Sequence, residues 1–128
     1  MASDEVKLSK LEMQVMRSFW KLKRATVREA HEAIPDGPEK PEYTTAQTVI
    51  SRLEAKGAIH RLKKIGNAWV YQPLVSRKSV VGRLIDDLVG VLDGATSPIV
   101  SHLAESGKLS EEDIKEIEQI ITKSEKRK

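Results

Sequence analysis

A run of short polar side chains between residues 44 and 52 has the residue types best suited to molecular recognition. The segment reads TTAQTVISR, and its apolar members recur at helical spacing through Ala46, Val49, Ile50 and Leu53. On a helix, these four residues form one face, and hydroxyl, amide and guanidinium groups form the other. That outer face comprises Thr44, Thr45, Gln47, Thr48, Ser51 and Arg52.

Side chains of this kind suit the edges of DNA bases. A Gln amide can make two hydrogen bonds to adenine, and a Thr methyl group can pack on the methyl group of thymine. The amides at a helix N-terminus also attract phosphate. We therefore predict base-reading roles for Thr44, Thr45, Gln47 and Thr48, and backbone contacts for Ser51 and Arg52. The alternative is that these residues are only helix caps and solvated positions.

Basic residues gather beside a predicted turn at Gly66-Asn67. The flanking runs, residues 58–65 and 68–74, are prone to form strands, and a Gly-Asn pair is typical of a two-residue hairpin turn. A basic hairpin tip can lie on the DNA backbone or enter the minor groove. The predicted backbone contacts here are Arg61, Lys63, Lys64 and Asn67. The alternative is an edge strand that lysines protect from aggregation.

Helices must precede this hairpin. Three capping boxes, at residues 9–12, 26–29 and 44–47, each predict the start of a helix. A Pro-rich loop, residues 35–42, separates the second helix from the third, and Gly57 ends the third. We expect Trp20, Trp69 and Tyr71 to be core residues. The order of three helices and a hairpin predicts a winged helix-turn-helix domain over residues 1–75.

Residues 76–128 are expected to form three further helices with breaks near residues 93–96 and 107–109. Their apolar residues are aliphatic only. Burying one such side chain yields about 1.5–3 kcal/mol, while ordering costs roughly 1.5 kcal/mol per residue, so a lone arm has almost no net stability. A second copy is the natural partner; the alternative is an arm folded back on its own winged helix. The predicted dimerisation residues are Leu84, Ile85, Leu88, Leu92, Ile99, Leu103, Ile114, Ile117 and Ile121.

The composition excludes several other classes of protein. The 128 residues contain no cysteine, which removes disulfides, Cys-based zinc sites and cysteine nucleophiles. The three histidines, His31, His60 and His102, are widely spaced, and no Gly-rich phosphate loop is present. We therefore expect no enzyme, no metal and no cofactor. No apolar run approaches the roughly 18 residues of a membrane span, and the N-terminus has no signal-like segment, so the expected location is cytoplasmic.

Charge is distributed unevenly along the chain. The net charge is +3, but the front half is basic, whereas the back half is acidic except for its basic tail. This asymmetry agrees with a front half that binds a polyanion and a back half with another role. The predicted fold class is mainly α with a small β-hairpin, namely an N-terminal winged helix-turn-helix and a C-terminal helical dimerisation arm.

Several segments together resemble the penicillinase repressor family, the BlaI, MecI and CopY type. They are LSKLEMQVM (residues 8–16) with Trp20, TVREA (26–30), YTTAQTVISRLEAKG (43–57), NAWVYQPLVSR (67–77) and SEEDIKEIEQI in the last helix. The resemblance implies a homodimeric repressor that binds double-stranded DNA at an inverted-repeat operator, commonly built on TACA/TGTA half-sites. By position, Thr44, Thr45 and Gln47 would read bases, with Thr48 and Arg52 beside the backbone.

The resemblance also carries expectations about regulation. Copper-responsive members have a C-terminal CxCxxxxCxC motif, which a chain without cysteine lacks. In β-lactam-responsive members a membrane sensor protease triggers cleavage at an Asn-Phe bond. This chain has no Asn-Phe pair, and the equivalent region falls at His102-Leu103. A sensor protease, or a protease acting downstream of it, is therefore an implied partner whose cleavage bond would differ.

The sequence as a whole predicts a dimeric transcriptional repressor, most simply of a resistance or stress operon, with no membrane insertion. Two other hypotheses stay open. One is a winged helix used for protein–protein contact without sequence-specific DNA binding, which would need an exposed apolar patch on the third helix. The other is a ligand-binding regulator with a cavity at the dimer interface.

Overall fold

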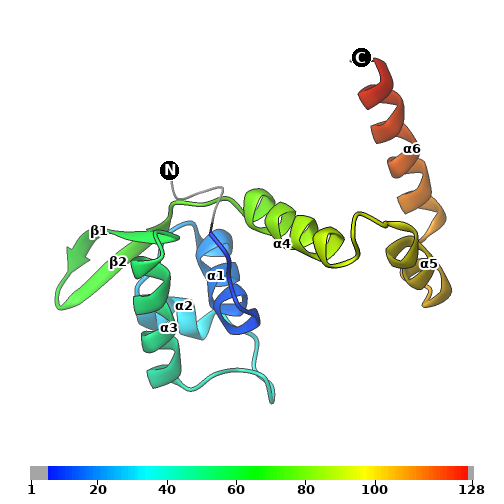
Figure 1. Cartoon of the computed structure of the whole chain (residues 1–128). Helices are drawn as coiled ribbons and strands as arrows, with labels where there is room; N and C mark the ends of the chain where they lie inside the picture. The colour runs from blue at the N-terminus through cyan, green and yellow to red at the C-terminus, as the bar shows by residue number, and fades with distance from the viewer. Residues whose placement is uncertain (1–5, 127–128) are drawn as a thin grey trace. The chain divides into compact units, whose positions relative to one another are not determined.

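The structure is a computed structural model that describes residues 6–126. The chain divides into two compact units, Met1–Asp87 and Leu88–Lys128. Three helices and a hairpin make up most of the first unit (Figure 1). In chain order they are α1 (Lys10–Leu22), α2 (Val27–Glu32), α3 (Tyr43–Ala55), β1 (Ile59–Ile65) and β2 (Ala68–Pro73). This is the predicted winged helix-turn-helix order.

Local capping explains where the first two helices begin. The Ser9 hydroxyl accepts a hydrogen bond from the Glu12 amide at 3.1 Å, and the Glu12 carboxylate accepts one from the Ser9 amide at 2.8 Å. Thr26 and Glu29 make the same reciprocal pair at the start of α2. Both predicted capping boxes are confirmed. Such a cap stabilises a helix because it satisfies amides that have no partner within the helix.

The third predicted capping box is wrong. Helix α3 begins one residue earlier, at Tyr43, with Glu42 in the N-cap position and no side-chain capping bond. Thr44 therefore lies inside the first turn, where its backbone is already helical and its hydroxyl is not used as a cap. At the other end, Gly57 follows Lys56 with a φ of 81°, a left-handed conformation that favours glycine.

The core of the first unit forms where the three helices meet β2. Phe19 of α1 packs edge-on against Tyr71 of β2 with ring centroids 6.3 Å apart. Leu53 of α3 and Ile34 after α2 are buried in the same cluster. Trp20 is only partly buried against it, and its indole nitrogen donates to the Val75 carbonyl at 2.9 Å. This bond joins α1 to the chain that follows the hairpin.

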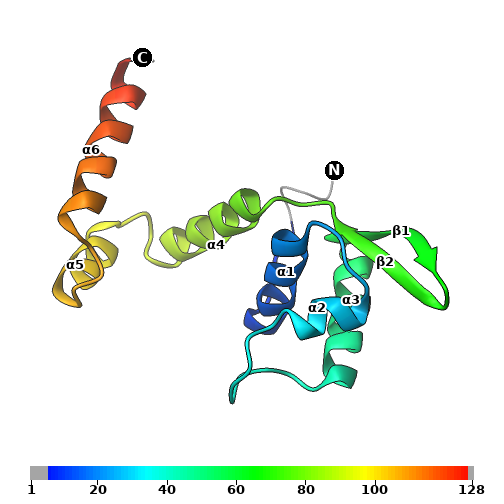
Figure 2. The same cartoon turned by 180° about the vertical axis from the view of Figure 1, so that it is seen from behind.

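The hairpin is antiparallel, with Ile59 opposite Pro73 at its base and Ile65 opposite Ala68 at its tip. A register shift between Arg61 and Lys63 marks a β-bulge, a feature that increases strand twist. Figure 2 shows the hairpin extending beyond the three helices. Its base is joined to them by two backbone hydrogen bonds between Ala25 and Tyr71, at 3.0 and 2.8 Å. The sequence did not predict this extra bridge.

Helix α4 (Arg77–Val91) belongs to both units. Its start is capped by the Ser76 hydroxyl, which accepts a hydrogen bond from the Ser79 amide at 3.0 Å. Val80 is buried in the core of the first unit, and Val81 packs against it. The two units meet inside α4, after Asp87. The division into a winged-helix DNA-binding domain over residues 1–75 and a helical dimerisation domain over residues 76–128 stays a prediction.

The second unit contains the end of α4 together with α5 (Ser97–Glu105) and α6 (Glu111–Lys126). Ser110 and Asp113 form a capping box at the start of α6, with bonds of 2.9 and 3.1 Å. No residue of α5 is buried, and large aliphatic side chains of α6 stay exposed. Within this unit the end of α4 and α5 line a shallow apolar groove of about 320 Å³. Its walls are Leu88, Leu92, Pro98, Ile99, His102 and Leu103.

Candidate nucleic-acid interface

Helix α3 has the two faces that its sequence predicts. Its four apolar residues are buried, so one side of the helix is fixed to the core. The other side is exposed from Thr44 to Arg52 and carries hydroxyl groups, one amide and one guanidinium there. All six predicted recognition residues lie on this exposed side: Thr44, Thr45, Gln47, Thr48, Ser51 and Arg52. Their roles toward individual bases or phosphates stay predictions.

One threonine hydroxyl on the exposed side of α3 already has a hydrogen-bond partner within the helix. The Thr48 hydroxyl donates to the Thr44 carbonyl at 3.2 Å. This bond turns its proton toward the helix and leaves its methyl group and the lone pairs of its oxygen for an outside partner. Thr48 is therefore better suited to apolar contact with a thymine methyl than to donating a hydrogen bond.

Aromatic and cationic groups hold the N-terminal end of α3 against α2. The His31 ring stands edge-on to the Tyr43 ring with centroids 5.6 Å apart, and His31 Nε2 lies 2.8 Å from the Pro41 carbonyl oxygen. The Arg28 guanidinium lies over the Tyr43 ring, 5.5 Å from its centroid. These contacts fix the tyrosine that begins α3, and so they fix the direction in which α3 leaves the loop.

The wing carries its cations around one exposed indole. The Arg61 guanidinium lies 4.9 Å from the Trp69 ring centroid, and the Lys64 ammonium lies 5.5 Å from it. Arg61 Nε also makes an ion pair with Glu54 Oε2 of α3 at 3.0 Å. Among the described residues, Lys63 makes no ion pair. Arg61 is thus partly neutralised, whereas Lys63 and Lys64 keep their charge available for phosphate.

The expectation that Trp69 is a core residue is wrong. Trp69 is 36% exposed, whereas Tyr71, two positions along the same strand, is 7% exposed. The reason is distance along the hairpin. Tyr71 lies at the Ala25 bridge, where the helices reach the strand, while Trp69 lies nearer the tip, beyond that bridge. Its apolar surface is covered by the side chains of Arg61 and Lys64 instead.

A groove of about 480 Å³ lies between α3 and the wing. Gln47 lines it from α3, Asn67 and Trp69 line it from the hairpin, and Arg28 lines it from α2. The fold therefore brings together one predicted base-reading residue and one predicted backbone-contact residue. Arg28 was not selected from the sequence. The available signal was an exposed cation in the first turn of the helix before α3, a position close to any phosphate in this groove.

The nine predicted dimerisation residues remain solvent-accessible. Leu84, Ile85, Leu88, Ile114, Ile117 and Ile121 are exposed by 41–53%, and Leu92, Ile99 and Leu103 are half-buried. They lie on α4, α5 and α6. Exposed aliphatic side chains in this number are unusual on a protein surface, and their role in dimerisation stays a prediction.

The described residues contain no group of three His, Asp or Glu side chains arranged to hold a metal ion. None of the helices over residues 6–126 is both long enough and apolar enough to cross a lipid bilayer.

Comparison with solved structures gives matches of low similarity. A cysteine-to-serine mutant of MarR from E. coli, crystallised with operator DNA, is 15% identical, with 91% of this chain and 75% of that chain covered and a TM-score of 0.49. A double mutant of ZitR from Lactococcus lactis is 11% identical, with 99% and 80% covered and a TM-score of 0.46. No curated protein sequence matches this chain.

The comparison with protein families is decisive. The model of the penicillinase repressor family matches residues 8–123, which is nearly the whole chain and includes α3, the wing and all three C-terminal helices. The expected family resemblance is therefore confirmed. The chain belongs to the penicillinase repressor family, whose members are DNA-binding transcriptional repressors with a winged helix and not enzymes.

Proposed function

We propose that this protein is a homodimeric repressor that binds an inverted-repeat operator. The observation that carries the proposal is the exposed side of α3, which presents threonine, glutamine and serine side chains and no large apolar residue. A helix of this kind is suited to the major groove, with Thr44, Thr45, Gln47 and Thr48 toward the bases. Ser51 and Arg52 then lie toward the backbone.

The wing supplies the second contact in this proposal. Lys63, Lys64 and Asn67 are exposed near its tip, and the groove beside them has room for the sugar-phosphate chain. Contacts to phosphate orient the protein without reading sequence, and they make its affinity depend on salt. Arg61 adds to this positive surface less than a free arginine would, because Glu54 is its ion-pair partner.

The exposed aliphatic residues of α4, α5 and α6 support a dimer. The described part of α6 alone exposes Ile114, Ile117, Ile120 and Ile121 by 44–58%. A second copy would offer the same surface, so a two-fold contact could cover both sets at once. Two-fold symmetry then places two copies of α3 on half-sites about one turn of B-DNA, or a multiple, apart.

The proposed output is repression by steric exclusion of polymerase, at genes for resistance or stress. A repressor must reach chromosomal DNA to bind its operator, so the proposed location of this protein is the cytoplasm. Release by a sensor-linked protease is a further proposal. His102 and Leu103 lie within α5, and His102 is exposed. Since proteolysis favours flexible, accessible backbone, cleavage there would require α5 to open locally.

Footprinting tests the main proposal. The DNA upstream of the protein's own gene is incubated with the full chain at about 0.15 M salt, where nonspecific binding is weak. A protected inverted repeat is the expected result. Equal protection of this DNA and of a random duplex would refute sequence-specific repression.

The rival use of the fold, as a protein–protein contact module, has a separate test. A DNA-binding surface should retain the protein on heparin and release it at a salt concentration that falls when wing lysines are removed. A module that binds only proteins should pass through unretained. The exposed side of α3 gives this rival no apolar patch to use.

A further inference from the structure

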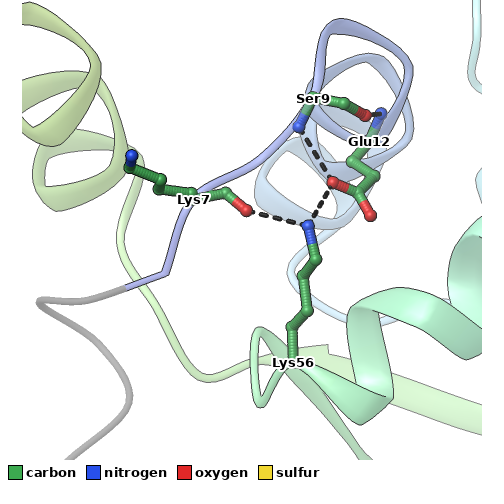
Figure 3. Close-up of polar contacts among 4 residues, drawn as sticks. All are labelled: Lys7, Ser9, Glu12 and Lys56. Carbon is green, nitrogen blue, oxygen red and sulfur yellow. Dashed lines mark hydrogen bonds and ion pairs between the residues drawn. The ribbon is translucent and has the colours of Figure 1, made fainter. Parts of the chain in front are cut away.

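A partly buried ion pair joins the C-terminal end of α3 to the start of α1. Lys56, the C-cap residue of α3, places its Nζ 2.6 Å from Glu12 Oε1 (Figure 3). The same Nζ donates to the Lys7 carbonyl at 2.9 Å. The Glu12 oxygen in turn accepts the Ser9 amide at 2.8 Å. One ammonium thus connects the end of the proposed reading helix with two other segments of the chain.

The carboxylate of this pair is buried, unlike that of a surface ion pair. The Glu12 side chain is 5% exposed and the Lys56 side chain 41%. By contrast, Lys10 and Glu39 pair at 3.4 Å with side chains 93% and 78% exposed. Surface pairs of that kind contribute little, whereas a buried carboxylate needs its partner. Lys56 also stands at the C-terminus of α3, where the helix dipole favours a cation.

Residues Val6–Ser9, which we call the N-terminal strap, carry this connection toward α4. Val6 and Leu8 are each 6% exposed and belong to the same buried cluster as Val80 of α4. The carbonyl of Lys7, between them, accepts a hydrogen bond from Lys56. The Lys7 ammonium also lies 3.6 Å from Asp87 Oδ2 of α4, but both side chains are well exposed, at 64% and 40%. The connection of the strap to α4 therefore depends mainly on the buried packing of Val6 and Leu8 with Val80.

We propose that Glu12, Lys56 and the N-terminal strap are positioning elements that set the angle between α3 and α4, and through it the operator spacing that the repressor accepts. Neither Glu12 nor Lys56 belongs to the six-residue outer side of α3. They act on recognition through the orientation of that helix.

The link from this angle to spacing rests on the proposed dimer. The predicted dimerisation residues Leu84 and Ile85 lie on the part of α4 that belongs to the first unit, and both are exposed. Whatever fixes α3 to this part of α4 therefore also limits how far the two reading helices of the proposed dimer can move apart. One base pair added between half-sites shifts one of them by about 3.4 Å and rotates it by about 35°. Two winged helices held at a fixed angle to α4 cannot follow both changes. Two winged helices whose angle to α4 can vary are able to follow them.

The first experiment measures the angle within one subunit, without DNA. Because the chain has no cysteine, Ser51→Cys on α3 and Asp86→Cys on α4 provide two specific sites for spin labels. Both positions are exposed. Labelled chains are diluted with unlabelled chains, so that pulsed electron resonance reports one intrasubunit distance. The otherwise unchanged chain should give a single narrow distribution.

The variants separate the ion pair from the helix cap. Glu12→Gln keeps an oxygen that accepts the Ser9 amide, as glutamine does in a capping box, but it loses the charge. Lys56→Met removes the ammonium from the half-exposed side and keeps the aliphatic stem. Both should broaden the distance distribution. Lys56→Arg should restore it, and Glu39→Gln, which neutralises the exposed pair with Lys10, should leave it unchanged.

The second experiment reads operator spacing. Each protein selects from a duplex library of inverted repeats with spacers of different lengths. We expect the wild type to recover one spacer length and Glu12→Gln to recover neighbouring lengths as well, with the same half-site sequence. A stability loss alone would lower the yield for every spacer and would not change this preference.

The outcomes distinguish this inference from the function on which it rests. A distribution for Glu12→Gln and Lys56→Met as narrow as that of the wild type overturns the positioning role, whatever DNA is bound. A broadened distribution with unchanged spacer preference overturns the role in spacing. A wild type that selects no inverted repeat refutes the proposed function, while the spin-label result still decides whether the pair sets the angle. Thermal melts followed by circular dichroism establish that each variant is folded.

Discussion

The guanidinium of Arg61 lies 4.9 Å from the ring centroid of Trp69, while its Nε binds the Glu54 carboxylate of α3 at 3.0 Å. One cation thereby joins the exposed indole of the wing to the last turns of the proposed reading helix. The wing is held in a defined direction by this contact as well as by the backbone bridge at its base.

Replacing Trp69 should therefore loosen the wing more than it destabilises the fold. Trp69→Leu keeps apolar bulk but removes the aromatic face, a contact worth about 0.5–1 kcal/mol at an exposed site. We expect a small decrease in the free energy of unfolding, measured by urea denaturation, and a clear loss of affinity for duplex DNA. Trp69→Phe, which keeps an aromatic face, should lose less. Equal effects of both substitutions on DNA affinity would contradict a role for the stacked cations.

Gln47→Ala tests base reading by α3. Loss of a bidentate contact should cost about 1–3 kcal/mol at one base pair and relax the preference there. Competition binding against every single-base variant of the footprinted operator measures this directly. Gln14→Ala, on α1, is a matched control outside the exposed side of α3. If Gln47→Ala weakens all sequences by the same factor, the side chain does not read a base.

Lys63→Ala tests the backbone contact of the wing. Removing one phosphate contact should weaken specific and random duplexes alike and reduce the slope of log affinity against log salt by about one. Lys115→Ala removes the same charge from α6 and serves as the control. Because Arg61 is paired with Glu54, Arg61→Ala should change the salt slope less than Lys63→Ala does. The reverse order would show that the ion pair opens on DNA.

Ile117→Asp tests the dimer surface of α6. A charge in the centre of the aliphatic stripe should convert the dimer to a monomer in light scattering, because a buried unpaired carboxylate is costly. Gln119→Asp adds the same charge two positions away, on the opposite side of α6, and should leave the dimer intact. A dimer that survives Ile117→Asp would move the subunit contact away from α6.

Acid should weaken the connection between α1 and α3. Burial raises the pKa of Glu12, but hydrogen bonds from Lys56 and Ser9 and the charge of Lys56 outweigh it, so its pKa lies below the ordinary value of 4.5. A carboxyl with a lowered pKa in the folded state stabilises the protein above its unfolded pKa and loses this contribution as the pH falls through the folded pKa. The difference in unfolding free energy between wild type and Glu12→Gln should be largest near neutral pH and shrink below about pH 4.5. If the difference in unfolding free energy between wild type and Glu12→Gln is the same at pH 3 as at pH 7, the Glu12 carboxylate does not stabilise the fold through its charge.

Local patterns in the sequence predicted most of the fold. Capping boxes and apolar spacing are properties of a few neighbouring residues, so Ser9, Thr26 and the Gly66-Asn67 turn could be assigned without tertiary information. The start of α3 could not, because its N-cap residue, Glu42, makes no side-chain capping bond that a local pattern would show. The exposure of Trp69 depends on how far the helices reach along the hairpin, which no local pattern encodes.

The candidate site was predictable to a similar extent. The exposed side of α3 follows from helical periodicity alone, and all six of its residues lie where the spacing places them. Arg28 and the pairing of Arg61 with Glu54 depend on contacts between elements. The Lys56–Glu12 pair joins residues 44 positions apart, and nothing in either local segment indicates it.

The missing side-chain cap on α3 has a thermodynamic consequence. Amides in its first turn have no side-chain acceptor, so they are left to water until an anionic oxygen arrives. A polyanion that accepts hydrogen bonds from these amides binds the folded chain and not the unfolded chain. It therefore raises the melting temperature. The rise in melting temperature with short duplexes thus reports the total binding of DNA to the folded protein, to which these amides contribute.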